Sequence, residues 1–345
     1  MLRAFMGRFR RFVDSFTIAL ILTVVIATVI PCRGGFARVF DIITTAAIAL
    51  LFFLHGARLS REAIVSGMSH WRLHALVFSG TFILFPALGL LFKPLSSTIL
   101  SPELYLGVMF LCVLPSTIQS SIAFTSIAGG NVPAAICSAS ASNVFAVFLT
   151  PMLVSLLVSG KAAESSMAGS FGAIMLQILV PFVTGHLVRL WIGEWVQTSP
   201  RLTGGVDRGS ILLVVYTAFS EAVVEGLWKQ IPLGALAGLV LVDFLLLGIV
   251  MVAMWTLGSL FRFDRADKIT ILFCGSKKSL ASGVPIAKVL FEGSIVGPMI
   301  LPLMLFHQIQ LMTCAVLAQR WARRASLVQE GGASGSKSRS VSTGC

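Results

Sequence analysis

The chain has 345 residues, of which 56% are hydrophobic and only 12% are charged. Soluble domains carry about twice that charged fraction, so the composition excludes a soluble globular protein and predicts a polytopic membrane protein. The net charge of +12 does not indicate nucleic-acid binding, because the basic residues lie between apolar segments and no nucleic-acid-binding motif accompanies them. The six cysteines have neither zinc-ligand nor disulfide-framework spacing.

A basic stretch at residues 1–12 precedes an apolar run that ends near Ile30. This arrangement is similar to a signal peptide, but residues 29–32 (Val-Ile-Pro-Cys) lack the small residues of a cleavage site. We therefore interpret the run as a retained first transmembrane helix.

Windows of about 20 apolar residues predict ten transmembrane helices. Their expected ranges are 13–31, 39–56, 71–92, 105–128, 132–158, 170–191, 208–223, 232–258, 267–291 and 295–320. The chain then divides into a basic cytoplasmic N-terminus at 1–12, a transmembrane domain at 13–322 and a disordered, Ser/Gly-rich cytoplasmic tail at 323–345.

Basic side chains are unevenly distributed over the predicted loops. With the N-terminus in the cytoplasm, the opposite side carries only Arg33, Arg38, Lys93, Lys161 and Lys229. This asymmetry predicts a multi-pass protein of the cell inner (plasma) membrane with both termini cytoplasmic and an even number of helices.

The predicted helices form two sets of five, at about 13–158 and 170–320. An odd number per set places the sets in opposite orientations, which is the inverted repeat of secondary transporters. The fourth helix of each set is interrupted, by Leu-Pro-Ser-Thr-Ile-Gln-Ser-Ser at 114–121 and by Gly-Ser-Lys-Lys-Ser at 275–279. Proline removes a helical donor and glycine permits non-helical backbone. The sequence therefore predicts an all-α fold with broken fourth and ninth helices and a central site between them.

At the first break, unwound carbonyls and hydroxyl groups offer oxygen ligands to a cation, and the restarting helix offers free N–H groups to an anion. The alternative is that the hydroxyls bond back to their own helix or join neighbouring helices. Ser138 and Asn143 of the fifth helix either face this break or serve close helix packing. The candidates at the break are Pro115, Ser116, Thr117, Gln119, Ser120 and Ser121.

The second break contains Gly275, Ser276, Lys277, Lys278 and Ser279. An ammonium group at bilayer depth costs roughly 2.5–3.5 kcal/mol, so it faces a protein interior or a water-filled cavity. One lysine is expected to bind an anionic solute group, while the other fills a cation position or snorkels. The alternative is a short interfacial loop in which both lysines snorkel.

We expect Lys278→Met to abolish transport and Lys277→Met to act more mildly, with folding retained in both. Lys278 lies closer to the restarting half-helix and to Ser282, which is four residues further on. Asp243, within another apolar run, either pairs with a lysine or sits near a membrane face. His55 and His307 are expected to make hydrogen bonds between helices.

Several segments resemble the bile acid:sodium symporter family, in its branch of bacterial symporter-like proteins and their animal relatives. These segments are residues 52–56, 115–117, 128–132, 273–280 and 302–308, and the resemblance covers nearly all of 10–322. It implies ten helices in a five-plus-five inverted repeat with a panel domain and a core domain. It also implies that the fourth and ninth helices cross at their unwound middles, and that an organic anion moves with sodium.

Compared with sodium-coupled members, this chain departs from the family pattern at the ion site. The resemblance places their ninth-helix Glu and Gln-Asn pair among residues 274–279, where lysines stand instead. It places a third-helix sodium-binding Gln near Thr81, a Ser-Asn pair near Ser120 and Ser121, and fifth-helix hydroxyl ligands beside Ser138. The missing carboxylate leaves two candidate coupling ions: sodium, at Ser120 and Ser121, and a proton, because a low-dielectric core disfavours the charged form of a lysine.

The main hypothesis is a secondary active transporter of a small organic anion, embedded in the lipid bilayer and without a cofactor other than its coupling ion. The alternative is a non-transporting regulatory or scaffold protein that retains the fold. An intramembrane enzyme is not supported, because the chain lacks Gly-x-Ser-x-Gly, His-Glu-x-x-His and paired-carboxylate motifs.

Overall fold

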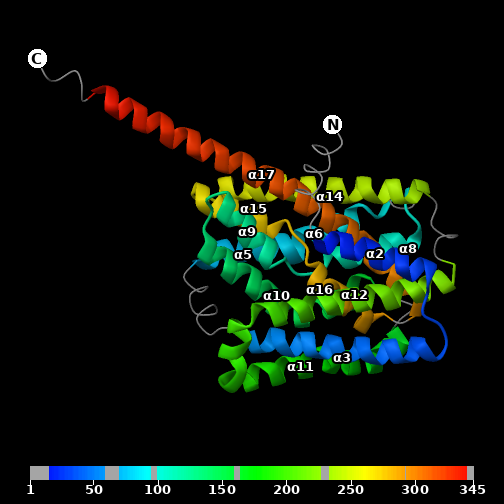
Figure 1. Cartoon of the computed structure of the whole chain (residues 1–345). Coiled ribbons are helices and arrows are strands. Elements are labelled where there is room, and N and C mark those ends of the chain that lie inside the picture. The colour runs from blue at the N-terminus through cyan, green and yellow to red at the C-terminus, as the bar shows by residue number, and fades with distance from the viewer. Residues whose placement is uncertain are drawn as a thin grey trace, which may run out of the picture.

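The computed structural model describes residues 15–58, 70–94, 99–158, 164–226, 233–291 and 293–339, and this part of the chain is nearly all helical (Figure 1). The predicted basic N-terminus at 1–12 lies outside the described residues. The first part of the chain forms α2 (Ser15–Val29), α3 (Gly35–Arg58), α5 (Trp71–Ser79), the π-helix η2 (Gly80–Leu84), α6 (Phe85–Leu91), α8 (Pro102–Cys112), α9 (Gln119–Ile127) and α10 (Val132–Leu157). The second part forms α11 (Glu164–Thr198), α12 (Pro200–Val224), α14 (Leu233–Leu260), α15 (Arg265–Gly275), α16 (Leu280–Leu290), the 3-10 helix η4 (Gly293–Ile295) and α17 (Val296–Arg339).

Long apolar helices identify a polytopic membrane protein. Among the described residues, five helices have the length and hydropathy needed to cross a bilayer: Gly35–Arg58, Trp71–Leu91, Val132–Leu157, Gly234–Leu260 and Val296–Arg324. Two shorter apolar helices cover Ile18–Val29 and Pro102–Cys112. Each predicted range thus coincides with a helix or a broken helix, while the inverted repeat itself stays a prediction.

The C-terminal helix continues past the end of the predicted transmembrane domain. α17 runs to Arg339 and projects away from the other helices (Figure 1), where we expected a disordered tail from residue 323. Residues 322–329 are rich in Ala, Arg, Leu and Gln, which favour continuation of a helix. The last six residues, 340–345, lie outside the described part.

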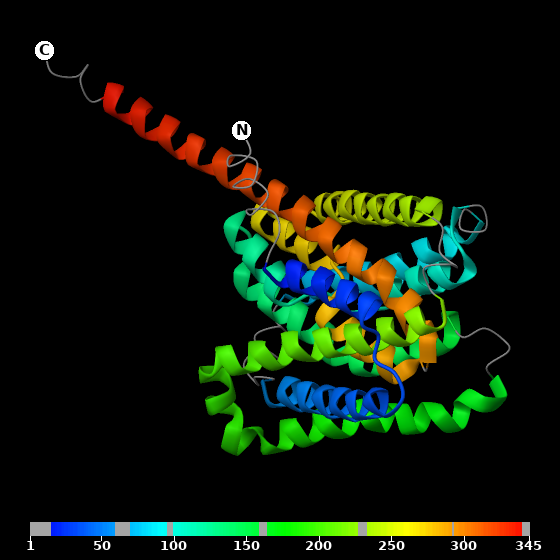
Figure 2. The same cartoon turned by 45° about the vertical axis from the view of Figure 1, so that its right-hand side comes forward.

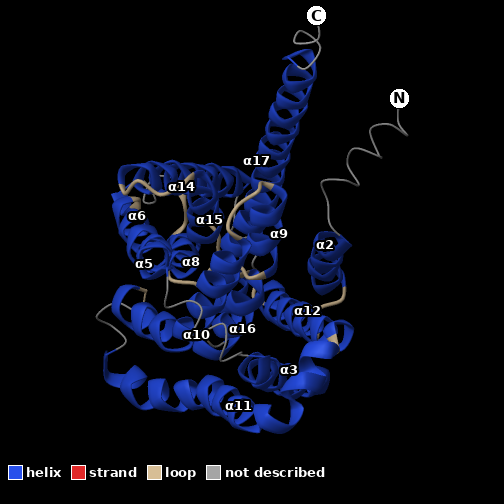
Figure 3. Cartoon of the chain, turned by 90° about the vertical axis from the view of Figure 1, so that its left-hand side faces the viewer, coloured by secondary structure: helices blue, strands red, loops and turns tan. Residues whose placement is uncertain are grey.

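The helices form a peripheral layer and a larger core. We call α2, α3, α11 and α12 the peripheral layer: α11 packs along α3, and α12 packs against α2 and α3 (Figures 1 and 2). The remaining helices form the core, with α14 on the side away from α3 and α11 (Figure 3). Both broken helices, α8–α9 and α15–α16, belong to the core, and α16 contacts α12 at the boundary.

Two glycines bring α3 and α11 into close contact. A Cβ at Gly56 would collide with the backbone carbonyl of Phe182, and a Cβ at Gly185 would collide with that of Phe53. Because the obstacles are backbone atoms on the facing helix, no side-chain rotation can relieve them. The pair therefore holds the peripheral layer together through backbone approach, as small residues do in membrane helix packing.

We expect Gly56→Ala and Gly185→Ala each to lower the stability of the purified protein by roughly 1–3 kcal/mol, since overpacking forces the two helices apart. Thermal unfolding in detergent measures the effect. Gly209→Ala in α12 is the matched control, because nothing lies within 4 Å of a Cβ there. A loss of stability in the control equal to that in the other two variants would contradict the close-contact account.

Candidate functional site

The break between α8 and α9 frees backbone carbonyls. Pro115 has no N–H to donate, and the Ser116 N–H turns away from its own helix to the Ser142 Oγ of α10, at 3.0 Å. The carbonyl of Cys112, which that N–H would otherwise have reached, is therefore left for another donor. Thr150 of α10 supplies a hydroxyl donor to the Val113 carbonyl at 2.9 Å. Side chains of α10 thus hydrogen-bond part of the unwound segment, but the Cys112 carbonyl still lacks a donor from α10.

The break between α15 and α16 lies directly against the first one. The Ser279 N–H donates to the Pro115 carbonyl at 2.8 Å. In return, the hydroxyl of Ser116 donates to the Cys274 carbonyl at 2.6 Å, and that of Ser121 to the Phe273 carbonyl at 3.1 Å. Each break therefore provides hydrogen-bond partners for backbone groups of the other. These bonds require the two broken helices to meet at their unwound middles.

A third irregularity, which the sequence analysis did not anticipate, lies in η2. The N–H of Phe85 donates to the Gly80 carbonyl, five residues back, as in a π-helix. The next residue, Pro86, has no N–H to continue this pattern, so the Thr81 carbonyl loses its helical donor. Pro86 was the available signal in the sequence, five residues after Thr81.

The side chain of Lys278 joins all three irregular segments. Its fully buried ammonium donates to the carbonyls of Thr81 at 2.8 Å, Cys112 at 2.8 Å and Leu114 at 2.7 Å. An ammonium group has three N–H donors, so every one is used. Its Nζ also lies 4.2 Å from the centre of the Phe85 ring, a favourable cation–π distance. We call these three carbonyl oxygens the carbonyl cradle.

Gln310 of α17 fixes the backbone of the same lysine. Its Oε1 accepts from the Lys278 N–H at 2.9 Å, and its Nε2 donates to the Lys278 carbonyl at 2.8 Å. Gln310 in turn lies 2.9 Å from the Nδ1 of His307. Sequence reasoning singled out His307 and missed Gln310, although a glutamine within an apolar helix was a signal for it.

The adjacent Lys277 has a different environment. Its ammonium is fully buried and donates to the Ser120 carbonyl at 2.8 Å, which is its one hydrogen-bond acceptor within the described part of the chain. The rings of Phe124 and Phe273 complete its surroundings, with centres 4.2 and 5.2 Å from Nζ. Because only one of its three donors has a carbonyl acceptor in the described part of the chain, Lys277 retains capacity for an additional acceptor that Lys278 lacks.

We call the point where the two breaks meet, around residues 115–116 and 274–279, the crossing. Asn143 of α10 and the serines at the start of α16 lie beside it. Asn143 donates to the Ser116 carbonyl at 2.8 Å, and its Oδ1 accepts from the Ser282 hydroxyl at 2.7 Å. Ser279 caps α16 by accepting from the Ser282 N–H at 3.2 Å. Asn143 therefore lies at the crossing, the first of the two alternatives left open by the sequence.

Other predicted site residues lie near the crossing without entering it. The Thr81 hydroxyl donates to the Val77 carbonyl of its own helix, and the Ser276 hydroxyl donates to the Leu272 carbonyl. Ser138 lies 2.7 Å from the His74 Nδ1 instead. Gln119 is exposed at the start of α9.

The oxygens proposed for sodium already have partners in this conformation. The Ser120 carbonyl accepts from Lys277, and the Ser121 hydroxyl donates to Phe273. The hydroxyl of Thr117 lies 2.7 Å from that of Ser120 and 3.1 Å from that of Ser121. Three backbone carbonyls converge elsewhere, in the carbonyl cradle, where they accept from the Lys278 ammonium.

His55 belongs to a separate cluster in the peripheral layer. Its Nε2 lies 3.7 Å from Asp207 Oδ1, and Arg58 pairs with Asp207 Oδ2 at 3.0 Å. These contacts join α3 to α12, but 3.7 Å is too long for the interhelical hydrogen bond expected of His55, so that expectation stays a prediction.

The geometry changes the expectation that folding survives equally in both lysine variants. Lys278→Met would leave three buried carbonyls without donors, at about 1–3 kcal/mol each, whereas Lys277→Met would leave only one. We expect the melting temperature of purified Lys278→Met to fall well below that of Lys277→Met. Equal losses in the two variants would mean that the carbonyl cradle does not depend on the ammonium.

Comparison with known proteins agrees with this architecture. The model of the SBF-like CPA transporter family matches residues 14–323. The chain is 58% identical over 319 residues to "Uncharacterized protein PA2026" of Pseudomonas aeruginosa and 54% identical over 319 residues to "Putative symporter YfeH" of Escherichia coli, covering in both cases 92% of this chain and 96% of the relative. It is also 28% identical over 318 residues to "Sodium/bile acid cotransporter 7-B" of Xenopus laevis, covering 88% of this chain and 90% of the relative. The resemblance to bile acid:sodium symporters is confirmed, and the chain belongs to the SBF-like CPA transporter family.

Proposed function

We propose that this protein is a secondary active transporter of a small organic anion that works without sodium. The observation that carries the proposal is the pair of buried lysines at the meeting point of two broken helices. Broken helices in transporters place half-helix ends and unwound backbone at the substrate and ion sites. Here Lys277 and Lys278 divide these tasks between them.

Lys277 is the proposed contact for the anion. Its ammonium has one protein acceptor, the Ser120 carbonyl, and Ser120 is only half-buried at the start of α9. The N-terminal end of a helix carries a partial positive charge, which adds to the attraction for an anion. The Phe124 and Phe273 rings beside the ammonium suit an anion that also has an apolar body. Bile acids, which appear in the names of the vertebrate relatives, are anions of this kind.

Lys278 is the proposed replacement for the coupling cation. Sodium is bound in proteins by oxygen atoms, and three carbonyl oxygens converge on Nζ at 2.7–2.8 Å. A positive charge that is covalently part of the chain neutralises these oxygens permanently. Transport therefore proceeds with the charge of the cradle already in place.

The membrane topology completes the proposal. We infer ten crossings in a five-plus-five inverted repeat, in the cell inner membrane, with both termini cytoplasmic. The layers support this inference: α2 and α3 begin the first set, α11 and α12 begin the second, and these four helices pack as the peripheral layer. The uneven distribution of Lys and Arg over the loops supports the orientation.

Uptake by proteoliposomes tests the transport function. We expect at least one member of a panel of radiolabelled organic anions, including taurocholate and smaller carboxylates, to accumulate under an imposed ion or electrical gradient. The rate should be unchanged when choline replaces sodium at constant pH. A strict sodium requirement would refute the role of Lys278, and no uptake of any member would favour a regulatory or scaffold protein that retains the fold.

A test that needs no substrate uses Lys278→Ala, which removes the ammonium group from the carbonyl cradle. We expect sodium or methylammonium to raise the melting temperature of this variant relative to choline, because a free cation can enter the cradle. Lys277→Ala, which leaves the cradle intact, is the matched control and should show no such difference. Equal responses of both variants and of the wild type would show that the cradle is not a cation position.

A further inference from the structure

Asp243 is a buried carboxyl group that the proposed site does not use. Its side chain is fully buried in α14, and neither carboxyl oxygen has a hydrogen-bond partner within the described part of the chain. It lies roughly 15 Å from the start of α14 and 25 Å from its end, counted at the helical rise per residue. It therefore lies deep in the membrane-spanning part of the protein, away from both ends of the helix.

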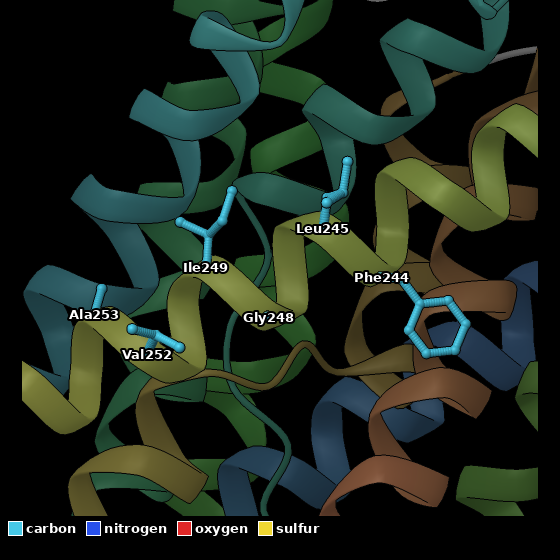
Figure 4. Close-up of a pocket in the computed structure, with 6 residues that line it drawn as sticks. All are labelled: Phe244, Leu245, Gly248, Ile249, Val252 and Ala253. Atoms are coloured by element: carbon cyan, nitrogen blue, oxygen red, sulfur yellow. The ribbon is translucent and has the colours of Figure 1, made fainter.

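Asp243 faces the interior of the core. The outer surface of α14 is a shallow apolar depression lined by Phe244, Leu245, Gly248, Ile249, Val252 and Ala253 (Figure 4). Asp243 belongs to the opposite stripe, together with the buried Val242, Leu246 and Val250. The helix thus turns its apolar surface outward and its one carboxylate-bearing residue inward.

Asp243 and Lys278 have a common neighbour in Cys112 of α8. Both charged groups lie near the Cys112 side chain, and the Cys112 carbonyl belongs to the carbonyl cradle. α14 also packs against η2 and α6, which contribute the Thr81 carbonyl and Phe85 to the surroundings of Lys278. Asp243 therefore lies next to the cradle without pairing with its ammonium.

Several charged or titratable groups on α5, α15 and α17, which pack against α14, have partners away from Asp243. Asp267 of α15 accepts from the Asn131 side chain at 2.8 Å. Lys268 of α15 lies 5.3 Å from the Trp255 ring, and Arg72 of α5 reaches the Phe261 carbonyl at 3.4 Å. Both contacts are near the C-terminal end of α14, about 18 Å or more along the helix from Asp243. His74 of α5 is bonded to Ser138, and His307 of α17 to Gln310.

An ionised carboxylate without donors is strongly disfavoured in such a place, whereas a neutral carboxylic acid is tolerated. We propose that Asp243 is a proton-binding site of this transporter: it holds a proton in the present conformation and releases it to water in another conformation. In the release step the carboxyl O–H bond breaks, its electron pair stays on the carboxylate, and water accepts the proton. The positive charge of Lys278, across Cys112, offsets the carboxylate that results. This inference rests on the proposed transport function.

A purely structural role explains these features less well. An apolar residue of similar size would fill the same space without the cost of burying a polar group. Unlike an apolar residue, a carboxyl group in this inward position can change its protonation state, and the nearby positive charge of Lys278 stabilises its ionised form.

Infrared spectroscopy of the wild-type protein in liposomes tests the protonation directly. At neutral pH we expect a carbonyl stretching band of a protonated carboxylic acid, and we expect Asp243→Asn to remove it. Asp207→Asn is the matched control, because Asp207 is also buried but pairs with Arg58 at 3.0 Å and should contribute no such band. Absence of the band in the wild type, or its persistence in Asp243→Asn, would overturn the proposal.

Exchange and transport test the release of the proton. Transfer of the wild-type liposomes to D2O should shift the band, because the proton reaches water when the protein changes conformation; a band that never shifts would overturn the proposal even without a known substrate. With any labelled anion that the wild type carries, the uptake rate should respond to a pH gradient in the wild type and lose that response in Asp243→Asn. Failure of the wild type to carry any anion would count against the proposed function, whereas an unchanged pH response in Asp243→Asn would count against Asp243 alone.

Discussion

Hydrogen bonds between the buried Lys278 ammonium and three backbone carbonyls lower the free-energy cost of burying both kinds of group inside a membrane. A backbone carbonyl without a donor costs several kcal/mol in a lipid environment, and a charge at membrane depth is also costly. Two irregular segments of the core, η2 and the α8–α9 break, expose three carbonyls between them, and one side chain from the α15–α16 break supplies all the missing donors. Lys278 therefore joins η2 to both breaks, while direct hydrogen bonds between the two breaks hold these against each other.

Close packing of α14 depends on glycine at two of these irregular segments. A Cβ at Gly80 would lie 2.6 Å from the Met254 Sδ, and a Cβ at Gly275 would lie 2.4 Å from the Met254 Cε. Met254 of α14 thus occupies space left by a glycine in η2 and another at the end of α15. Because both glycines admit the same side chain, α14 lies directly against the region around Lys278.

The positions of the breaks could be predicted from local signals, whereas the identity of the contacting atoms could not. Proline at 115 and paired lysines at 277 and 278 conflict with an uninterrupted helix in lipid, so the sequence alone shows where the helices break. The role of Thr81 depends on its carbonyl rather than its hydroxyl, and this follows only from the π-helical register before Pro86. Gln310 reaches Lys278 because of how α17 is rotated against the break, and no local pattern encodes that rotation.

Ion pairs at the outer end of α16 join the core to the peripheral layer. α16, which begins two residues after Lys278, carries Lys288 near its other end, 3.0 Å from Asp41 of α3 and 3.9 Å from Glu221 of α12. The two carboxylates are about half exposed, and ion pairs of that kind contribute only about 0–1 kcal/mol. Within the layer, in contrast, α3 and α11 approach each other through backbone at Gly56 and Gly185. α16 therefore connects these exposed ion pairs at the peripheral layer with the buried Lys278 at the centre of the core.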